Sequence, residues 1–259
     1  MISAVRSLLR YRALVQSLVS RELKARYRGS VLGFLWSFVN PLLLLLTYTL
    51  VFTVILPNKQ PDIQPFFLFL FCGILPWTWF QASIAESAGS LIAGGNLIKK
   101  VLFPAEVLPT VCVLANLAHF LLGLPVLLAV LALYGKLHWT ALLLPLPMLV
   151  QLVLTLGLSL FLSALTVHFR DIQNLLTHIL QIWFFASPVI YAYPPSGALH
   201  RVLFFNPMTH VLVSYQEVLF YGRFHHLRGL AVTALVALLV FAAGARLFDR
   251  LRDTLAEEV

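Results

Sequence analysis

Charge is scarce in this chain. Of its 259 residues, 11% are Asp, Glu, Lys or Arg, whereas 60% are hydrophobic. Soluble domains have roughly 25% charged residues, so an ordinary water-soluble protein is excluded. One core cannot bury this much apolar surface, and lipid must cover the excess. The composition therefore indicates an integral membrane protein.

The sequence also lacks the motifs of many enzymes and ATPases. It has no GxxxxGKS or GxxxxGKT phosphate loop, no HExxH motif and no carboxylate pair on a water-facing segment. Its apolar segments carry no chain of acids and bases for proton or sodium coupling, and His119 is interpreted as a packed polar residue. We therefore expect no catalytic, metal-binding or cofactor-binding residue here, and any ATP must be bound by another subunit.

Cysteine is rare as well, and the basic excess is not patterned for nucleic acid. Cys72 and Cys112 lie in apolar runs without CxxC spacing, which is typical of buried thiols rather than of a metal or redox site. The net charge is +8, but the basic residues lie at the ends of apolar segments and form no stripe with aromatic residues. Nucleic acid is therefore disfavoured as a partner.

What the sequence has is long apolar runs, each near or above the roughly 20 residues that a helix needs to cross a bilayer. The runs are continuous, whereas barrel strands would alternate, so the prediction is an all-α membrane protein. Basic residues concentrate on the side of the N-terminus, which marks the cytoplasmic face and predicts that both termini are cytoplasmic. Six transmembrane helices are predicted, at about 31–56, 65–87, 106–134, 138–167, 172–193 and 229–247.

The segment that precedes the first span, residues 1–30, is predicted to be an amphipathic helix at the cytoplasmic membrane surface. Its apolar residues recur at three- and four-residue steps among arginines, the pattern of a helix that lies in the headgroup region. It would serve as an anchor and orientation signal, or it would act in gating or in holding a partner. Residues 31–259 then form the transmembrane domain.

Two loops are expected on the cytoplasmic side. Residues 90–104 combine a Gly-Gly hinge with exposed apolar side chains and end at Pro104, which predicts a short amphipathic helix that lies on lipid or docks into a cytosolic partner. The second loop is very short, and its neighbours Arg170 and Asp171 are interpreted as interfacial anchors without catalytic geometry.

On the opposite side, residues 194–224 contain apolar stretches that are shorter than a crossing. They are broken by Pro207 and carry Glu217. Such stretches are more often re-entrant than spanning, so we predict short gate helices that dip into the outer side of the bundle. The alternative is an amphipathic hairpin packed outside the bundle.

Two spans carry polar and aromatic stripes. Trp36, Asn40 and Thr47 share one face of the first span. On the fifth, the shared face carries Gln173, Thr177, Gln181 and Phe184. Hydrogen bonding at a subunit contact would explain both stripes. A translocation path is the functional interpretation, since amides, hydroxyls and aromatic faces suit sugars.

Five sequence blocks, at 21–42, 96–109, 169–176, 182–191 and 206–210, resemble the type-2 ABC-transporter permeases that export polysaccharides. That group includes O-antigen, capsule and teichoic acid exporters. The resemblance covers nearly the whole chain in order, and it is specific to the family rather than to the polymer.

The resemblance implies a homodimer with a channel between its subunits and two copies of a separate ATP-binding subunit, which would hold ATP and Mg. It implies a coupling helix with Asn96, Leu97, Ile98, Lys99, Lys100, Phe103 and Pro104. The cytoplasmic entrance would include Arg26, Tyr27, Arg28, Arg170 and Asp171, and the channel would be lined by the two stripes. The outer gate would include Tyr191, Tyr193, Asn206, Pro207 and Glu217.

The function expected from this resemblance is export of an undecaprenyl-linked polysaccharide across the bacterial inner membrane. The Arg-rich basic set and the sequence of the blocks favour O-antigen. Teichoic acid or capsule export, and a type-2 exporter of drugs or small lipids, are the alternatives within the class. A membrane-embedded glycan-modifying enzyme is the alternative from another class, but it would need clustered acids or a His-rich site.

Overall fold

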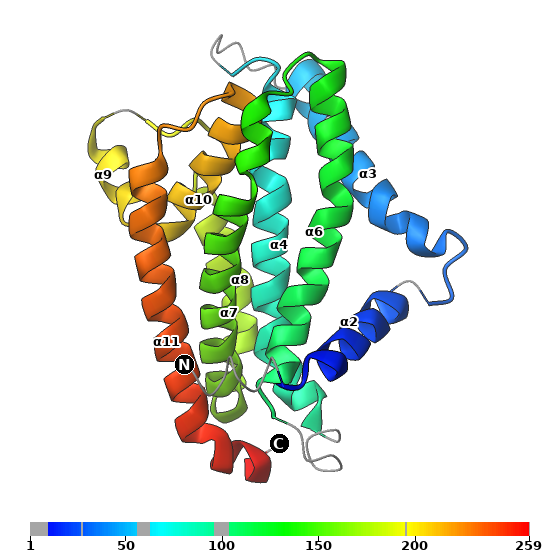
Figure 1. Ribbon diagram of the computed structural model, residues 1–259, viewed down its shortest axis with the longest axis vertical. Coiled ribbons are helices and arrows are strands. Elements are labelled where there is room, and N and C mark those ends of the chain that lie inside the picture. The colour runs from blue at the N-terminus through cyan, green and yellow to red at the C-terminus, as the bar shows by residue number, and fades with distance from the viewer. Residues whose placement is uncertain (1–9, 27, 56–62, 96–103, 195, 259) are drawn as a thin grey trace.

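The structure, a computed structural model, describes residues 10–26, 28–55, 63–95, 104–194 and 196–258 (Figure 1). All regular elements in these ranges are helical. The α-helices are α2 (Arg12–Arg26), α3 (Trp36–Leu50), α4 (Phe66–Ala93), α6 (Val107–Leu133), α7 (Pro145–His168), α8 (Ile172–Phe185), α9 (Ala198–Phe204), α10 (Pro207–Gln216) and α11 (Leu227–Glu258). Shorter helical turns are η1 (Gly33–Leu35), η2 (Val51–Ile55), η4 (Trp139–Leu143) and η5 (Glu217–Tyr221).

Five helices within the described ranges are long and apolar enough to cross a membrane, which confirms the all-α membrane class. They are Trp36–Ile55, Phe66–Ala93, Val107–Leu133, Trp139–His168 and Leu227–Leu251. Each overlaps a predicted span.

The predicted span at 172–193 is wrong in its length. Helix α8 ends at Phe185 after 14 residues, and at 1.5 Å per residue it extends about 21 Å, short of the ~30 Å hydrocarbon core. Two features stop it. Pro188 disfavours helix in the residue before it, and the Asn206 side chain donates a hydrogen bond to the Ala186 carbonyl at the helix end (2.8 Å).

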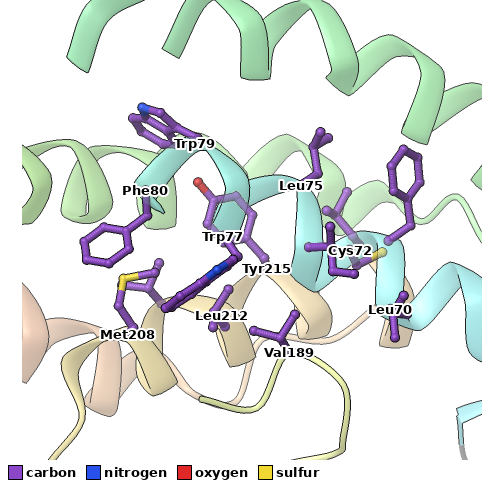
Figure 2. Close-up of a cluster of buried hydrophobic side chains, with 14 of the residues drawn as sticks. Leu70, Cys72, Leu75, Trp77, Trp79, Phe80, Val189, Met208, Leu212 and Tyr215 are labelled. Atoms are coloured by element: carbon purple, nitrogen blue, oxygen red, sulfur yellow. The ribbon is translucent and has the colours of Figure 1, made fainter. Parts of the chain in front are cut away.

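Helix α4 is the centre of the bundle, since nearly all of its first half is buried. Figure 2 shows its Trp77 and Phe80 beside Met208 and Leu212 of α10, while Trp79 points away from these two residues. A helix that is apolar all round can face lipid or protein, and α4 is surrounded by protein, namely α6, α7, α8 and α10.

The predicted amphipathic segment forms α2, although residues 1–9 lie outside the described ranges. Val15 and Leu18 of α2 are buried against Val107 and Val111 at the start of α6, so part of the apolar face meets protein rather than lipid. Beyond α2 the chain turns at Gly29, whose φ of 79° suits glycine. Helix α3 then diverges from α6 toward α2 (Figure 1).

Helices α7 and α11 pack along their lengths, and their backbones meet at two glycines. A Cβ on Gly157 would lie 2.6 Å from the backbone N and Cα of Phe241, and one on Gly244 would contact the Gly157 carbonyl. No side chain fits between the two helices at this level.

We expect Gly157→Ala to destabilise the protein by about 1–3 kcal/mol, because the added methyl group overpacks a contact between backbones. Thermal unfolding of the purified protein in detergent measures the change. Ala243→Val is the matched control, since Ala243 is exposed on α11. Equal midpoints for Gly157→Ala and the control would contradict the close contact.

Candidate functional site

The predicted coupling helix lies largely outside the described residues. Asn96, Leu97, Ile98, Lys99, Lys100 and Phe103 are all in the range 96–103, and their roles stay predictions. Its two ends are described. Helix α4 ends where the Gly94 N–H donates to the Ser90 carbonyl (2.9 Å), and buried Pro104 accepts from the Val107 N–H at the start of α6 (3.1 Å). The segment therefore connects directly to two helices of the bundle.

Arg26, a predicted entrance residue, joins three helices. One guanidinium nitrogen donates to Glu86 Oε1 of α4 (2.7 Å), and another donates to Asn116 Oδ1 of α6 (3.2 Å). Asn116 Nδ2 donates in turn to Glu86 Oε2 (2.6 Å), which closes the triangle. The Arg26 and Glu86 side chains are 29% and 37% exposed. Sequence reasoning missed Glu86 and Asn116 as partners, although a lone acid inside an apolar helix is the signal that identifies such a site.

The other predicted entrance residues do not join this triangle. Arg28, Arg170 and Asp171 are exposed, and Tyr27 lies outside the described residues. Asp171 precedes α8, and its backbone carbonyl accepts from the Leu175 N–H (3.1 Å). An entrance role for these four residues remains a prediction.

The two predicted lining stripes lie on different surfaces of the chain. Trp36 and Asn40 line a cavity of about 620 Å³ that is bounded by α3, α4 and α6. Thr47 is exposed, and its hydroxyl donates to the Leu43 carbonyl of its own helix (2.8 Å). On α8 the stripe residues Gln173, Thr177 and Gln181 are exposed.

The fourth residue of the α8 stripe, Phe184, is partly buried and packs against the core. The Phe184 ring packs edge-on against Trp77 with 5.7 Å between centroids. The stripe that remains on α8 is therefore polar, and a channel at a seam between two chains remains a prediction.

Asn206, a predicted gate residue, ties the end of α8 to the start of α10. Its Oδ1 accepts from Trp183 Nε1 (2.9 Å) and from the Met208 N–H (3.0 Å). Its Nδ2 donates to Ser187 Oγ (2.9 Å) as well as to Ala186. Asn206 is thus the N-cap of α10, and Pro207 occupies the first helical turn, where its missing N–H is harmless.

The predicted gate region does contain short helices. All residues from Met208 to Gln216 are buried, so α10 lies within the bundle and the alternative of an amphipathic hairpin outside it is wrong. Glu217 is 7% exposed, and its Oε2 accepts from the backbone N–H groups of His225 and His226 (both 2.8 Å). This carboxylate fixes the turn that leads into α11.

Two aromatic residues of the predicted gate lie on the segment after α8. The Tyr191 hydroxyl donates to the Phe185 carbonyl (3.1 Å), and burial raises its pKa. The Tyr193 ring lies beside His200 and His226, at 4.9 and 5.8 Å between centroids. Both residues hold this segment against its neighbours.

Sequence reasoning missed a pair of histidines at this end of the bundle. His210 Nε2 faces the Phe204 carbonyl (2.8 Å) and must donate to it, so the neutral ring accepts at Nδ1. His226 Nε2 then donates to His210 Nδ1 (2.7 Å). Burial lowers the pKa of His210, and burial together with His210 lowers the pKa of His226, although Glu217 opposes the shift of His226.

We expect the stability of the α10–α11 junction to fall as pH decreases. A histidine with a lowered folded pKa is stabilising above its unfolded pKa of about 6.5, and this contribution is lost on acidification because the unfolded state then binds more protons. Thermal unfolding between pH 8 and pH 5 measures it. His226→Gln keeps a donor but does not titrate, so its dependence on pH should be weaker.

His178→Gln is the matched control, because His178 is exposed on α8. It should retain the pH dependence of the unchanged protein. The same slope in His226→Gln and in the control would show that the histidine pair has no part in it.

We also expect Arg26→Met to destabilise the protein by about 1–3 kcal/mol, because Glu86 and Asn116 lose a charged hydrogen-bonding partner. The double variant Arg26→Met with Glu86→Met should recover part of this loss, since no unpaired charge remains. Thermal unfolding in detergent measures both, with exposed Arg28→Met as the control. Additive losses in the double variant would contradict coupling between the two residues.

The comparisons with known proteins agree on one family. The model of the ABC-2 type transporter family matches residues 13–220. The chain is 42% identical to an O-antigen export system permease protein RfbA of Myxococcus xanthus over the full length of both chains. It is 31% identical to one of Klebsiella pneumoniae, over 93% of this chain and 92% of the relative. It is also 25% identical to the polysialic acid transport protein KpsM of Escherichia coli, over 90% and 92% of the two chains. The chain therefore belongs to the ABC-2 type transporter family.

Proposed function

We propose that this protein is the permease subunit of an ATP-driven exporter that moves O-antigen, carried on an undecaprenyl lipid, across the bacterial inner membrane. The observation that carries this proposal is the 42% identity, over both full chains, to an O-antigen export permease. The permease cleaves no bond in its cargo. A capsule polysaccharide is the second candidate, because the chain is also 25% identical to a polysialic acid transport protein.

The energy comes from a separate ATP-binding subunit, which would hold ATP and Mg. The absence of a phosphate loop from the sequence supports this division of labour. The coupling segment between α4 and α6 is the contact with that subunit. Because it joins both helices directly, a push on it moves α4 and α6, and the Arg26 triangle passes the movement to α2.

Two permease chains would enclose the polysaccharide path. The exposure of α3 and α8 supports this arrangement, since no residue is buried in the most apolar stretch of α3 and η2. Helix α8 exposes Leu175, Ile179 and Ile182 together with its polar stripe. A second copy would cover the apolar residues and leave the amides and hydroxyls for sugar, which bonds to them without charge.

Both termini would lie on the cytoplasmic side. Helix α2 and the C-terminal end of α11 lie at the same end of the bundle, whereas α9 and α10 lie toward the other end (Figure 1). The chain thus returns across the bundle after α7, through short α8 and the segment that follows it. The concentration of basic residues at the α2 end supports its placement in the cytoplasm.

We expect inactivation of the gene to abolish surface O-antigen while undecaprenyl-linked chains accumulate inside the cell. Extraction of surface glycan and of lipid-linked intermediates measures both. A Phe103→Asp variant introduced into the null strain should not restore surface O-antigen, and the lipid-linked chains should still accumulate, because a charge in the apolar coupling segment prevents docking. Phe103→Leu is the matched control and should restore export. Unchanged surface glycan in the null strain would refute polysaccharide export.

A further inference from the structure

Two hollows lie one after the other along the same side of α4 and α6. The first is the cavity of about 620 Å³ that Trp36 and Asn40 line. The second, which we call the inner groove, has a volume of about 610 Å³ and lies nearer the coupling segment, between α2, α4 and α6. Gln173 at the start of α8 also lines the inner groove. Among the described residues, only Arg26 lines both hollows.

The walls of the two hollows form one continuous stripe on each helix. On α4 the stripe runs at steps of three and four residues, with its first two members in the cavity wall and the others in the groove wall: Thr78, Ala82, Glu86, Gly89 and Ala93. On α6 it runs from Cys112 in the groove to Asn116 and Phe120 in the cavity. Residues at such steps share one face of a helix. The two hollows are therefore parts of one cleft between α4 and α6, with α2 over the groove and α3 over the cavity.

The Arg26 triangle lies where the two hollows meet. Glu86 belongs to the groove wall and Asn116 to the cavity wall, and Arg26 donates to both, at 2.7 and 3.2 Å. Asn116 Nδ2 also donates to Glu86 Oε2 (2.6 Å), so side chains from three helices close the cleft at this level. The Glu86–Asn116 bond joins α4 to α6 and cannot persist when these helices move apart. Arg26 can then follow only one of them, and α2 moves with it.

The cavity beyond the triangle is suited to water and hydroxyl groups. Trp79 is 2% exposed and Ser37 is 4% exposed, and both are in the cavity wall. Neither the Trp79 Nε1 nor the Ser37 Oγ has a hydrogen-bond partner in the protein. An apolar occupant would leave both groups unsatisfied, which is unfavourable for buried polar atoms. A water molecule or a sugar hydroxyl can accept from both.

We propose that Arg26 is the bar of an inner gate. While the triangle is closed, the cavity is separated from the cytoplasmic side. When α4 and α6 move apart, groove and cavity join into one hydrated passage that reaches the level of Trp79.

The opening movement comes from the coupling segment, because this segment joins the ends of α4 and α6. Helix α3 is a wall of the cavity and also borders the seam between two chains, so the open gate admits the sugar end of the cargo beside that seam. These two statements rest on the proposed function. The separation of groove and cavity by Arg26 does not.

Thiol labelling from the cytoplasmic side tests the gate without any export. The full-length permease is studied in inverted inner-membrane vesicles with 2-(trimethylammonium)ethyl methanethiosulfonate, whose permanent charge keeps it out of lipid. Native Cys112 reports on the groove, because Cys72 is fully buried. Ala82→Cys in a Cys112→Ala background reports on the cavity beyond the bar. We expect rapid labelling at Cys112 and slow labelling at position 82.

Arg26→Met should speed labelling at position 82 about tenfold to a hundredfold, the range expected when one hydrogen bond to a charged group holds the bar closed. Glu86→Gln should act in the same direction, and it tests the gate independently if Arg26→Met fails to fold. Arg21→Met is the matched control. Arg21 is exposed on α2 and lines the groove, but it is not a member of the triangle. It should leave labelling at position 82 slow.

Three results would overturn the gate. Labelling at position 82 that is as fast as at Cys112 in the otherwise unchanged protein would show that nothing bars the cleft. Slow labelling in both Arg26→Met and Glu86→Gln would show that other groups close it. An equal increase with Arg21→Met would show that charge alone sets the rate. None of these results bears on the proposed export function, which the measurement of surface glycan tests separately.

Discussion

The fold depends on the enclosure of α4. In its first half this helix is apolar on every face and almost wholly buried, so other helices cover it where lipid could have done so. Helices α6, α7, α8 and α10 all contact it. Glu86 is the one acid on α4. It lies in the C-terminal part of α4, where Arg26 pairs with its charge and Asn116 donates a hydrogen bond to it.

The sequence predicted the bundle because hydrocarbon imposes strong and local rules. A helix that crosses lipid must be long, apolar and poor in charge, and five of the six spans predicted on this basis overlap such helices in the described residues. The short helices of the gate region followed from the same reasoning, since Pro207 and Glu217 interrupt an apolar stretch. The family resemblance was recognised from blocks of residues rather than from physics.

What the sequence could not show depends on partners that are distant along the chain. The end of α8 is fixed by Asn206, which lies 20 residues after Ala186. The histidine pair joins residues 16 positions apart, and the Arg26 triangle spans up to 90 positions. The spacing of Phe184 placed it on the stripe, but the sequence could not show that its ring packs edge-on against Trp77. Periodicity shows which face a residue occupies and not what meets that face.

The contact between Gly157 and Gly244 distinguishes the α7–α11 pair from the other helices of the bundle. Two backbones in direct contact have no layer of side chains to repack, so a movement of α7 against α11 would have to break this contact. Helix α3 has no comparable close contact, because no residue in its most apolar stretch is buried. A rearrangement that widens the protein would therefore move α3, whereas α7 and α11 would keep their mutual contact.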